Sequence, residues 1–331
     1  MEPGHDSDPP PRTRHPIARF VVWRVAVGVG LLAGISVLVF IGTAALPGDA
    51  AAEILGRNAG TGALAILNRE LGLDKPAPVR YWDWLVGLLH GSFGHSLVSG
   101  DPVSSLIGFR VVNTLILAGV AGLVLIPLAM VLGVIAGRRP GSAVDNVVAS
   151  ASLAMIAAPE FIIATILIFF FAVKLGLLPA VSILAFGANP LGDPAVLVLP
   201  VATLVIVGAA YIIRMVRAGV VEAMRSDYVQ MARLNGIPER RVVVKYGLRN
   251  ALAPTVQVIA LTLQWLIGGL FVVETVFAYP GIGYELVESV IARDIPVVQA
   301  VAMLIAAFYI GINILADVAV VLLVPKLRTA A

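Results

Sequence analysis

Six long apolar runs dominate the chain, separated by stretches in which charged residues, prolines and glycines collect. Each run is close to or longer than the ~20 residues that a helix needs to cross a bilayer. The expected spans cover residues 20–46, 111–136, 147–173, 195–216, 253–276 and 297–324. The first run is too long for a signal peptide and lacks a small-residue cleavage site at its end. The pattern predicts an all-α membrane protein with six transmembrane helices.

Composition supports a lipid environment, because 59% of the residues are hydrophobic and only 13% are charged. The chain has no cysteine, which excludes disulfides, thiolate metal sites and a cysteine nucleophile. Its four histidines are too scattered to predict a metal site. The net charge of +3 requires no nucleic-acid partner, since basic residues that flank membrane helices account for it.

Basic residues fall mainly on one side of the expected spans, which fixes the orientation. An even number of spans places both termini on one face, and the positive-inside rule makes that face cytoplasmic. The basic residues expected there are Arg12, Arg14, Arg19, Arg24, Arg138, Arg139, Arg214, Arg217, Arg225, Arg233, Arg240, Arg241, Lys245, Arg249, Lys326 and Arg328. Residues 1–16 are rich in proline and charge and are expected to form a disordered cytoplasmic tail, ahead of a membrane domain at 17–331.

Three connecting segments are long enough to have their own structure. The external loop 47–108 contains the aromatic run Tyr81-Trp82-Asp83-Trp84, which is expected at the lipid headgroups, with a binding role as the alternative. The cytoplasmic loop 217–252 is basic, and the external segment 277–296 follows the fifth span.

The cytoplasmic loop has the pattern of a helix, a sharp turn and a second helix. Asn235-Gly236 is expected to end the first helix, and Pro238 with Glu239 suits the first turn of the next. Such an element could lie on the membrane surface or dock on a soluble partner. An apolar stripe at helical spacing is predicted along the first helix, comprising Val220 or Val221, Met224, Tyr228 and Met231.

This loop resembles the signature loop of bacterial ABC-transporter permease subunits, especially the dipeptide/oligopeptide/nickel branch. The superfamily signature is Glu-Ala-Ala, three residues, then Gly. Here Gln230-Met231-Ala232 stands at the triplet and Gly236 at the glycine, within Asp227-Tyr228…Ala232-Arg233…Gly236…Leu248-Arg249-Asn250-Ala251-Leu252…Pro254.

The resemblance extends over nearly the whole chain after the tail and favours the B-type subunit. It departs at Asn235, where the family usually has lysine, at Tyr246-Gly247, and at the C-terminal Val324-Pro325-Lys326. The matching segments, in order, are Pro47-Gly48-Asp49, Leu71-Gly72-Leu73-Asp74, Gly91-Ser92-Phe93-Gly94, Asn113-Thr114-Leu115, Gly137-Arg138 through Asp145, Glu274 with Pro280-Gly281-Ile282-Gly283, Arg293-Asp294-Ile295-Pro296, and Asn313 with Asp317.

The resemblance implies a type I ABC importer permease in a bacterial inner membrane, taking up short peptides, nickel or related solutes. The implied partners are a second homologous permease, two ATP-binding subunits and an extracytoplasmic substrate-binding protein. ATP and magnesium would be bound by the partner ATPases, with no cofactor in this chain. Coupling is expected through the 225–245 loop, at Asp227, Tyr228, Gln230, Met231, Ala232, Arg233, Gly236 and Pro238.

A second group of residues is a candidate for the pathway or its gate: Glu274, Pro280, Gly281, Gly283, Asn313 and Asp317. The alternative for the two carboxylates is a place near helix ends, with Glu274 close to the external surface and Asp317 beside Asn313. Asn113 and Thr114 are expected at a helix start. The glycines after Pro280 predict a tight turn, followed by a short external helix at about 284–292 or by a plain loop.

Two other functions fit a multi-span chain less well. A secondary transporter driven by an ion gradient often has inverted repeats and several intramembrane carboxylates, and neither is evident here. A membrane enzyme would need a catalytic motif, and the chain has no His-Glu-x-x-His, Gly-x-Ser-x-Gly or phosphate-loop sequence. The chain is therefore predicted not to be an enzyme.

Overall fold

The computed structural model describes residues 16–44, 75–185, 187–242, 245 and 249–323, and every long element in this part of the chain is helical. The expected disordered tail and most of the first half of the large external loop lie outside the described residues. The elements are α1 (Pro16–Ala44), α4 (Ala77–Leu89), α5 (Val103–Arg138), α6 (Ala143–Ala157), α7 (Glu160–Leu167), η1 (Ile168–Lys174), η2 (Pro190–Gly192), α8 (Ala195–Arg225), α9 (Asp227–Leu234), α10 (Glu239–Arg241), α11 (Arg249–Val276), α12 (Ile282–Ile291) and α13 (Ile295–Leu323).

Four described helices, α1, α5, α8 and α13, are long and apolar enough to span a membrane, and the pair α6–α7 makes a fifth span if it is counted as one. The predicted fifth span corresponds to α11, whose apolar segment Leu261–Val276 is shorter. The all-α membrane fold is therefore confirmed, while the count of six spans and the side of the termini stay predictions.

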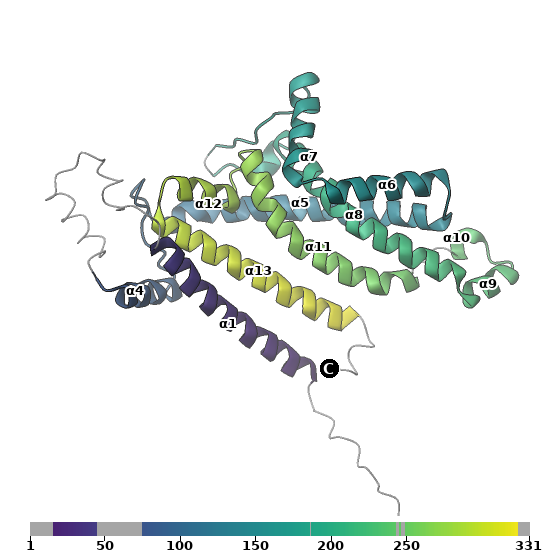
Figure 1. The fold of residues 1–331 in the computed structure, drawn as a ribbon, viewed down its shortest axis with the longest axis horizontal. Helices are drawn as coiled ribbons and strands as arrows, with labels where there is room; N and C mark the ends of the chain where they lie inside the picture. The colour runs from purple at the N-terminus through teal and green to yellow at the C-terminus, as the bar shows by residue number, and fades with distance from the viewer. Residues whose placement is uncertain (1–15, 45–74, 186, 243–244, 246–248, 324–331) are drawn as a thin grey trace, which may run out of the picture.

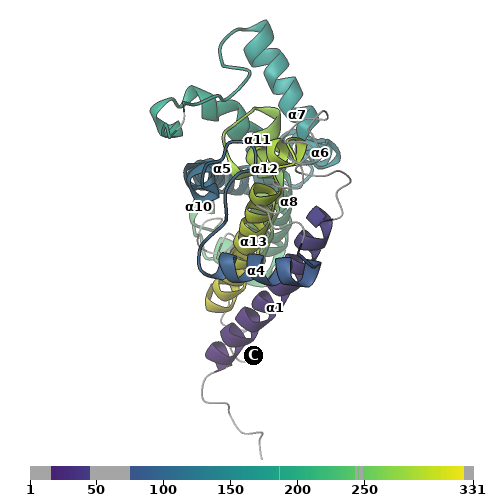
Figure 2. The ribbon, with the colours of Figure 1, turned by 90° about the vertical axis from the view of Figure 1, so that its left-hand side faces the viewer.

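The expected span over 147–173 is interrupted by a sharp break, so this segment is a broken span or a re-entrant loop. The chain bends by 109° between α6 and α7. Ala158 takes an extended conformation (φ −87°, ψ 125°) because the ring of Pro159 disfavours a helical residue before it. Figures 1 and 2 both show α7 projecting away from the bundle.

The core of the bundle is the contact between α5 and α8, which run side by side along its length (Figure 1). Two glycines of α5 allow the close approach. A Cβ at Gly133 would lie 2.7 Å from Val216 Cβ and 2.9 Å from the Ile213 carbonyl oxygen, and a Cβ at Gly137 would lie 2.8 Å from Val220 Cβ. Small residues spaced by four are the usual way for membrane helices to pack backbone against backbone.

A second layer is the pair α1 and α13, which contacts the core through α11 and α12. The predicted aromatic run lies on α4, which packs against α1. The hydroxyls of Tyr81 and Ser36 are 2.8 Å apart, and the ring centroids of Tyr81 and Phe40 are 5.4 Å apart. Trp82 points outward and is exposed, so its place at the headgroups stays a prediction.

We predict opposite effects of alanine at two glycines of the same helix. Gly137→Ala should lower the free energy of unfolding by about 1–3 kcal/mol, because its methyl group has no room beside Val220. Gly119→Ala should raise it by up to ~1 kcal/mol, since nothing lies within 4 Å of that position and alanine favours a helix. Unfolding in mixed micelles measures the change in free energy for both variants. Equal effects would contradict the close α5–α8 contact.

Candidate coupling surface and external gate

The cytoplasmic loop begins with a break that the sequence pattern did not predict. Ser226 is extended (φ −72°, ψ 151°) and separates α8 from α9. The expected continuous stripe is therefore wrong. Val220 and Met224 are buried on α8, whereas α9 turns Val229 and Ala232 inward. The outer face of α9 carries three apolar side chains, which are 42% exposed at Tyr228, 59% at Met231 and 82% at Leu234.

The predicted helix end at Gly236 is confirmed. Gly236 has φ +70°, its N–H donates to the Arg233 carbonyl at 2.9 Å, and the N–H of Ile237 donates to the Ala232 carbonyl at 3.2 Å. These two bonds form a Schellman motif. A Cβ at Gly236 would meet nothing within 4 Å, so the glycine is required by its backbone conformation and not by space.

An ion pair closes the turn after α9. The guanidinium of Arg233 donates to both carboxylate oxygens of Glu239, at 2.8 and 3.1 Å, and this contact lowers the pKa of Glu239. Pro238 immediately precedes the short helix α10, near the predicted start. The continuation of this helix towards the fifth span lies partly outside the described residues.

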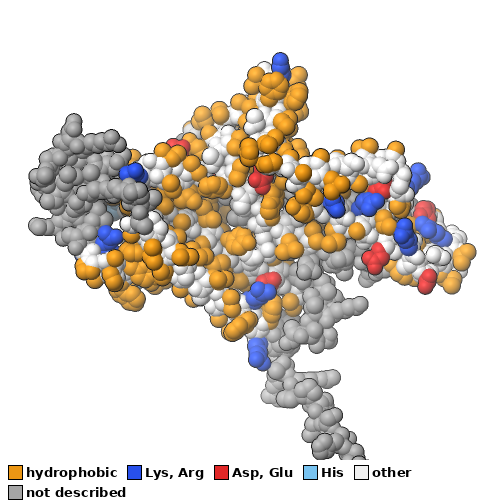
Figure 3. Space-filling model, viewed as in Figure 1, with side chains coloured by type: hydrophobic (Ala, Val, Ile, Leu, Met, Phe, Trp, Pro, Cys, Tyr) orange, Lys and Arg blue, Asp and Glu red, His pale blue; other side chains and the backbone are white. Residues whose placement is uncertain are grey.

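The eight predicted coupling residues gather at this end of the molecule. All are exposed except Ala232, which is buried against the chain itself. Figure 3 shows basic and acidic side chains concentrated over α9, α10 and the adjoining end of α8, next to a largely hydrophobic middle. This end therefore offers a small apolar patch (Tyr228, Met231 and Leu234) within a charged surface.

The same end holds a buried ion pair that sequence reasoning missed. Asp145 on α6 is buried and pairs with Arg217 on α8, and it also accepts the Gly141 N–H at 2.8 Å. The only signal in the sequence was the spacing from Ser142 to Asp145, which forms the N-cap of α6. The pair ties the first cytoplasmic loop to the helix that carries α9.

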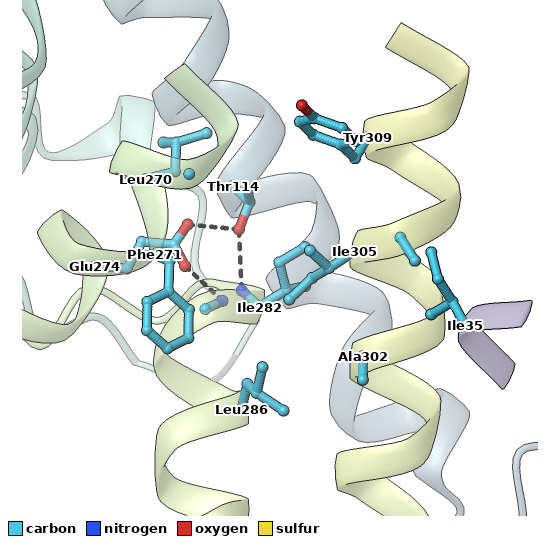
Figure 4. Close-up of a pocket in the computed structure, with 13 residues that line it drawn as sticks. Ile35, Thr114, Leu270, Phe271, Glu274, Ile282, Leu286, Ala302, Ile305 and Tyr309 are labelled. Carbon is cyan, nitrogen blue, oxygen red and sulfur yellow. Dashed lines mark hydrogen bonds between the residues drawn. The ribbon is translucent and has the colours of Figure 1, made fainter. Parts of the chain in front are cut away.

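At the external end, Glu274 is fully buried and holds three elements together (Figure 4). Its carboxylate accepts the Thr114 hydroxyl of α5 at 2.6 Å and the Gly283 N–H of α12 at 2.7 Å. Thr114 Oγ1 in turn accepts the Ile282 N–H at 2.9 Å. Glu274 lies near the end of α11, as the alternative expected, but it faces this network and not the external surface.

The roles expected for Asn113 and Thr114 are wrong. α5 begins at Val103, so these residues lie about three turns inside the helix and are buried. Asn113 Nδ2 donates to the Pro280 carbonyl at 2.9 Å, and Tyr279 Oη donates to the Asn113 carbonyl at 2.8 Å. Both residues fasten the segment after α11 to α5.

The tight turn expected of the glycines after Pro280 is present, because the Gly281 N–H donates to the Tyr279 carbonyl at 2.7 Å, but it needs no left-handed glycine. Gly281 has φ −105°, and the left-handed residue just before α12 is Ala278 at φ 48°. The glycines are needed for space. A Cβ at Gly281 would overlap the carboxyl group of Glu274, and one at Gly283 would lie 2.8 Å from Phe271 Cα.

The predicted external helix is present as α12, and the plain-loop alternative is wrong. Two further contacts hold it. Arg110 on α5 pairs with Glu285 at 2.8 Å, and the Ser96 hydroxyl donates to Asp294 just after α12. Burial raises the pKa of Glu285, and the charge of Arg110 opposes this.

Asn313 and Asp317 do not join this network. Asp317 pairs with Arg24 of α1 at 3.1 Å, so the expected pairing with Asn313 is wrong. Asn313 Nδ2 donates instead to the Tyr309 carbonyl of its own helix, at 3.0 Å. Asp317 therefore holds α13 against α1, whereas Asn313 bonds within α13.

A cavity of about 500 Å³ lies beside Glu274, between α11, α12 and α13. Its lining is mostly apolar. Figure 4 shows that two of its polar side chains, Thr114 and Glu274, already bond to each other, while the third, Tyr309, lies on α13. Among the described residues no cluster of His, Asp or Glu could hold a metal ion. The bonds of Glu274 and Thr114 fasten α12 to α5 and α11 at one end of this cavity.

Comparison with known proteins identifies the family. Residues 129–329 match the model of the binding-protein-dependent transport system inner membrane component, and residues 17–118 match its N-terminal model. The chain belongs to this family. It is therefore an ABC-transporter permease and a multi-pass protein of the inner membrane.

Relatives cover almost the full chain. A protein of Brucella abortus named as a peptide transport system permease is 34% identical over 308 residues, 93% of this chain and 98% of the relative. A glutathione transport system permease of Pectobacterium atrosepticum is 36% identical over 89% of this chain and 94% of its own length. A peptide ABC transporter permease of Sinorhizobium fredii is 32% identical over 93% and 99%.

We predict that Thr114→Val lowers the free energy of unfolding of this permease by about 2 kcal/mol or more, because both Glu274 and the Ile282 N–H lose a buried partner. Thr275→Val is the matched control. Thr275 is the next residue after Glu274, is partly exposed, and donates to the Phe271 carbonyl of its own helix. Unfolding measurements in mixed micelles should find the control nearly neutral, and equal losses would contradict the network.

Proposed function

We propose that this permease imports short peptides as one half of the membrane pathway of an ATP-driven transporter. A second homologous permease forms the other half, a substrate-binding protein delivers the peptide outside, and each permease engages one of two ATPase subunits through its 225–245 loop. The observation that carries the proposal is the outer face of α9, where Tyr228, Met231 and Leu234 are exposed beside charged residues.

The exposed face of α9 favours docking on a protein. The inner face of this helix already packs on the chain through Val229 and Ala232, so the outer apolar side chains are available for a partner. Helices that dock in grooves use apolar anchors three or four residues apart, and Tyr228, Met231 and Leu234 are each three residues apart. The charged residues around these side chains would orient the partner on the helix. A helix lying on lipid headgroups would use the same face, and the variants below separate the two.

The substrate assignment rests on the relatives, whose names give peptides and glutathione as their cargo. Glutathione is itself a modified tripeptide, so both kinds of relative are named for a cargo of short-peptide chemistry. Nickel and related solutes remain outside this proposal, because none of these relatives carries such a name.

In the proposed mechanism, ATP binding draws the two ATPase subunits together and moves α9. The Schellman turn and the Arg233–Glu239 pair keep α9 and α10 from shifting separately. α8 passes the motion to α5, to which it is packed through Gly133 and Gly137. Thr114 and Glu274 transmit it to α12 at the external mouth. The contacts of α9 with the ATPase drive this change only if they differ in strength between the two states.

The proposal is tested in proteoliposomes that contain the complete transporter, with trialanine and glutathione as probes. Uptake should require ATP and the binding protein. Leu234→Glu should reduce uptake by about tenfold or more, because it places a charge in the centre of the docking patch. Asn235→Asp, at the exposed end of the same helix and outside the predicted coupling residues, adds the same charge beside the patch and should retain uptake.

Two results would contradict the proposal. Uptake that persists without ATP and collapses with the proton or sodium gradient would indicate a secondary transporter. Normal ATP-dependent uptake by Leu234→Glu, with normal recovery of ATPase subunits on the purified permease, would remove α9 from the docking surface.

We also predict that Gly236→Val uncouples the transporter. Valine in the left-handed region costs about 1–2 kcal/mol, so the Schellman turn should open while the helices stay inserted. ATP hydrolysis should continue with uptake several-fold lower. Gly236→Asn is the control, because asparagine tolerates this conformation. The ratio of peptide transported to ATP hydrolysed measures the effect, and an unchanged ratio in the valine variant contradicts it.

A further inference from the structure

Glu160 is a carboxylate in the middle of an apolar segment, and sequence analysis passed over it. It is the first residue of α7, directly after the break at Pro159, and both halves of the broken span are otherwise apolar enough to lie in a membrane. Its side chain is only partly buried. Within the described part of the chain, Glu160 makes no ion pair or side-chain hydrogen bond.

The depth of Glu160 follows from its neighbours. A Cβ at Gly269 of α11 would lie 3.7 Å from Glu160 Oε1 and 3.5 Å from Leu204 of α8. At 1.5 Å per residue, Gly269 is about 10 Å from the external end of α11, and Leu204 about 14 Å from the start of α8. The hydrocarbon core is about 30 Å thick, so the carboxylate lies within it.

A charged group at this depth does not face lipid. Ionisable residues in membrane spans face the interior of the bundle or a water-filled cavity, because lipid leaves their charge uncompensated. The described helices leave part of the Glu160 side chain exposed, as they do Gly268 of α11. This exposed part therefore faces water, and in a two-permease transporter the water-filled space is the pathway between the subunits.

The surroundings of Glu160 suit an organic cation. The ring of Trp265 lies 3.5 Å from the same Gly269 position, so a carboxylate and an indole converge on one point of the wall. Gly269 is buried beneath these two side chains, and the adjacent Gly268 is exposed and carries no side chain that would obstruct a ligand. An ammonium ion is stabilised by a carboxylate and by the face of an indole ring, more strongly where water is partly excluded. Phe161, next to Glu160, is exposed and adds apolar surface.

We propose that Glu160, with Trp265, forms a site in the translocation pathway that binds the α-ammonium group of the peptide during transport. This rests on the proposed function and adds a chemical requirement that the cargo carry a positive charge. The site would hold the peptide at the bend between α6 and α7, where the span is interrupted.

The test measures binding to the whole transporter in nanodiscs without the binding protein, so that selection by that protein does not enter. The probes are trialanine, N-acetyltrialanine and N-acetyl-Ala-Ala-Lys, compared by saturation-transfer NMR with and without a non-hydrolysable ATP analogue. Wild type should bind trialanine about tenfold more tightly than its acetylated form in at least one nucleotide state. Tight binding of the lysine peptide instead would indicate a side-chain cation site and overturn the α-ammonium assignment.

Variants of Glu160 then test whether this side chain is what distinguishes trialanine from N-acetyltrialanine. Glu160→Gln should bring the ratio of the two trialanine affinities close to one, and Glu160→Asp should retain most of it. Glu288→Gln, which removes an exposed carboxylate of α12, is the matched control and should leave the ratio unchanged. If Glu160 had a purely structural role, its loss would not alter discrimination between two peptides that differ by one acetyl group.

Transport by the same preparations separates the two proposals. If wild type shows no ATP-dependent uptake of trialanine or glutathione, the proposed function fails and the site fails with it. If wild type transports trialanine but Glu160→Gln keeps the full discrimination, or wild type shows none, the cation site alone is overturned.

Discussion

The contact between α5 and α8 is the constraint on which the rest of the structure depends. Gly133 and Gly137 bring the two backbones within van der Waals distance over two turns. α8 ends at the break that leads into α9, and α5 carries Asn113 and Thr114, which fasten the external segment. Because interdigitated helices at this density do not slide freely, the pair joins the end of the bundle that carries α9 and the end that carries α12 into one mechanical unit.

Each end of this unit is stiffened by a different interaction. At the cytoplasmic end, the Asp145–Arg217 pair anchors α6 to α8, and the Arg233–Glu239 pair closes the turn after α9. At the other end, the buried carboxylate of Glu274 occupies the space where side chains would otherwise pack between α11 and α12. Gly281 and Gly283 leave just enough room for it. The bend at Pro159 is the exception, because α7 leaves the bundle there.

Hydrophobic patterning predicted the fold class well, because long apolar runs have few alternatives to a membrane helix. Local signals were also sufficient at Gly236, where a glycine after a helix has a specific conformation to adopt. Patterning failed at Ser226 and Pro159, where a single residue interrupts an apolar repeat that continues on both sides. It could not predict the bonds of Glu274 to Thr114 or of Asp317 to Arg24, since these partners are 160 and 293 residues apart in the chain and only the packing brings them together.

The proposed coupling requires α5, α8 and α9 to move as one body when the transporter turns over. The chain has no native cysteine, so paired labels can be placed on it directly. A pulsed electron paramagnetic resonance distance between nitroxides at Val112→Cys on α5 and Gln230→Cys on α9 tests the claim in the assembled transporter. The account predicts the same distance distribution in the nucleotide-free and ATP-bound states, and a shift of more than about 5 Å, comparable to one helical turn, would contradict it.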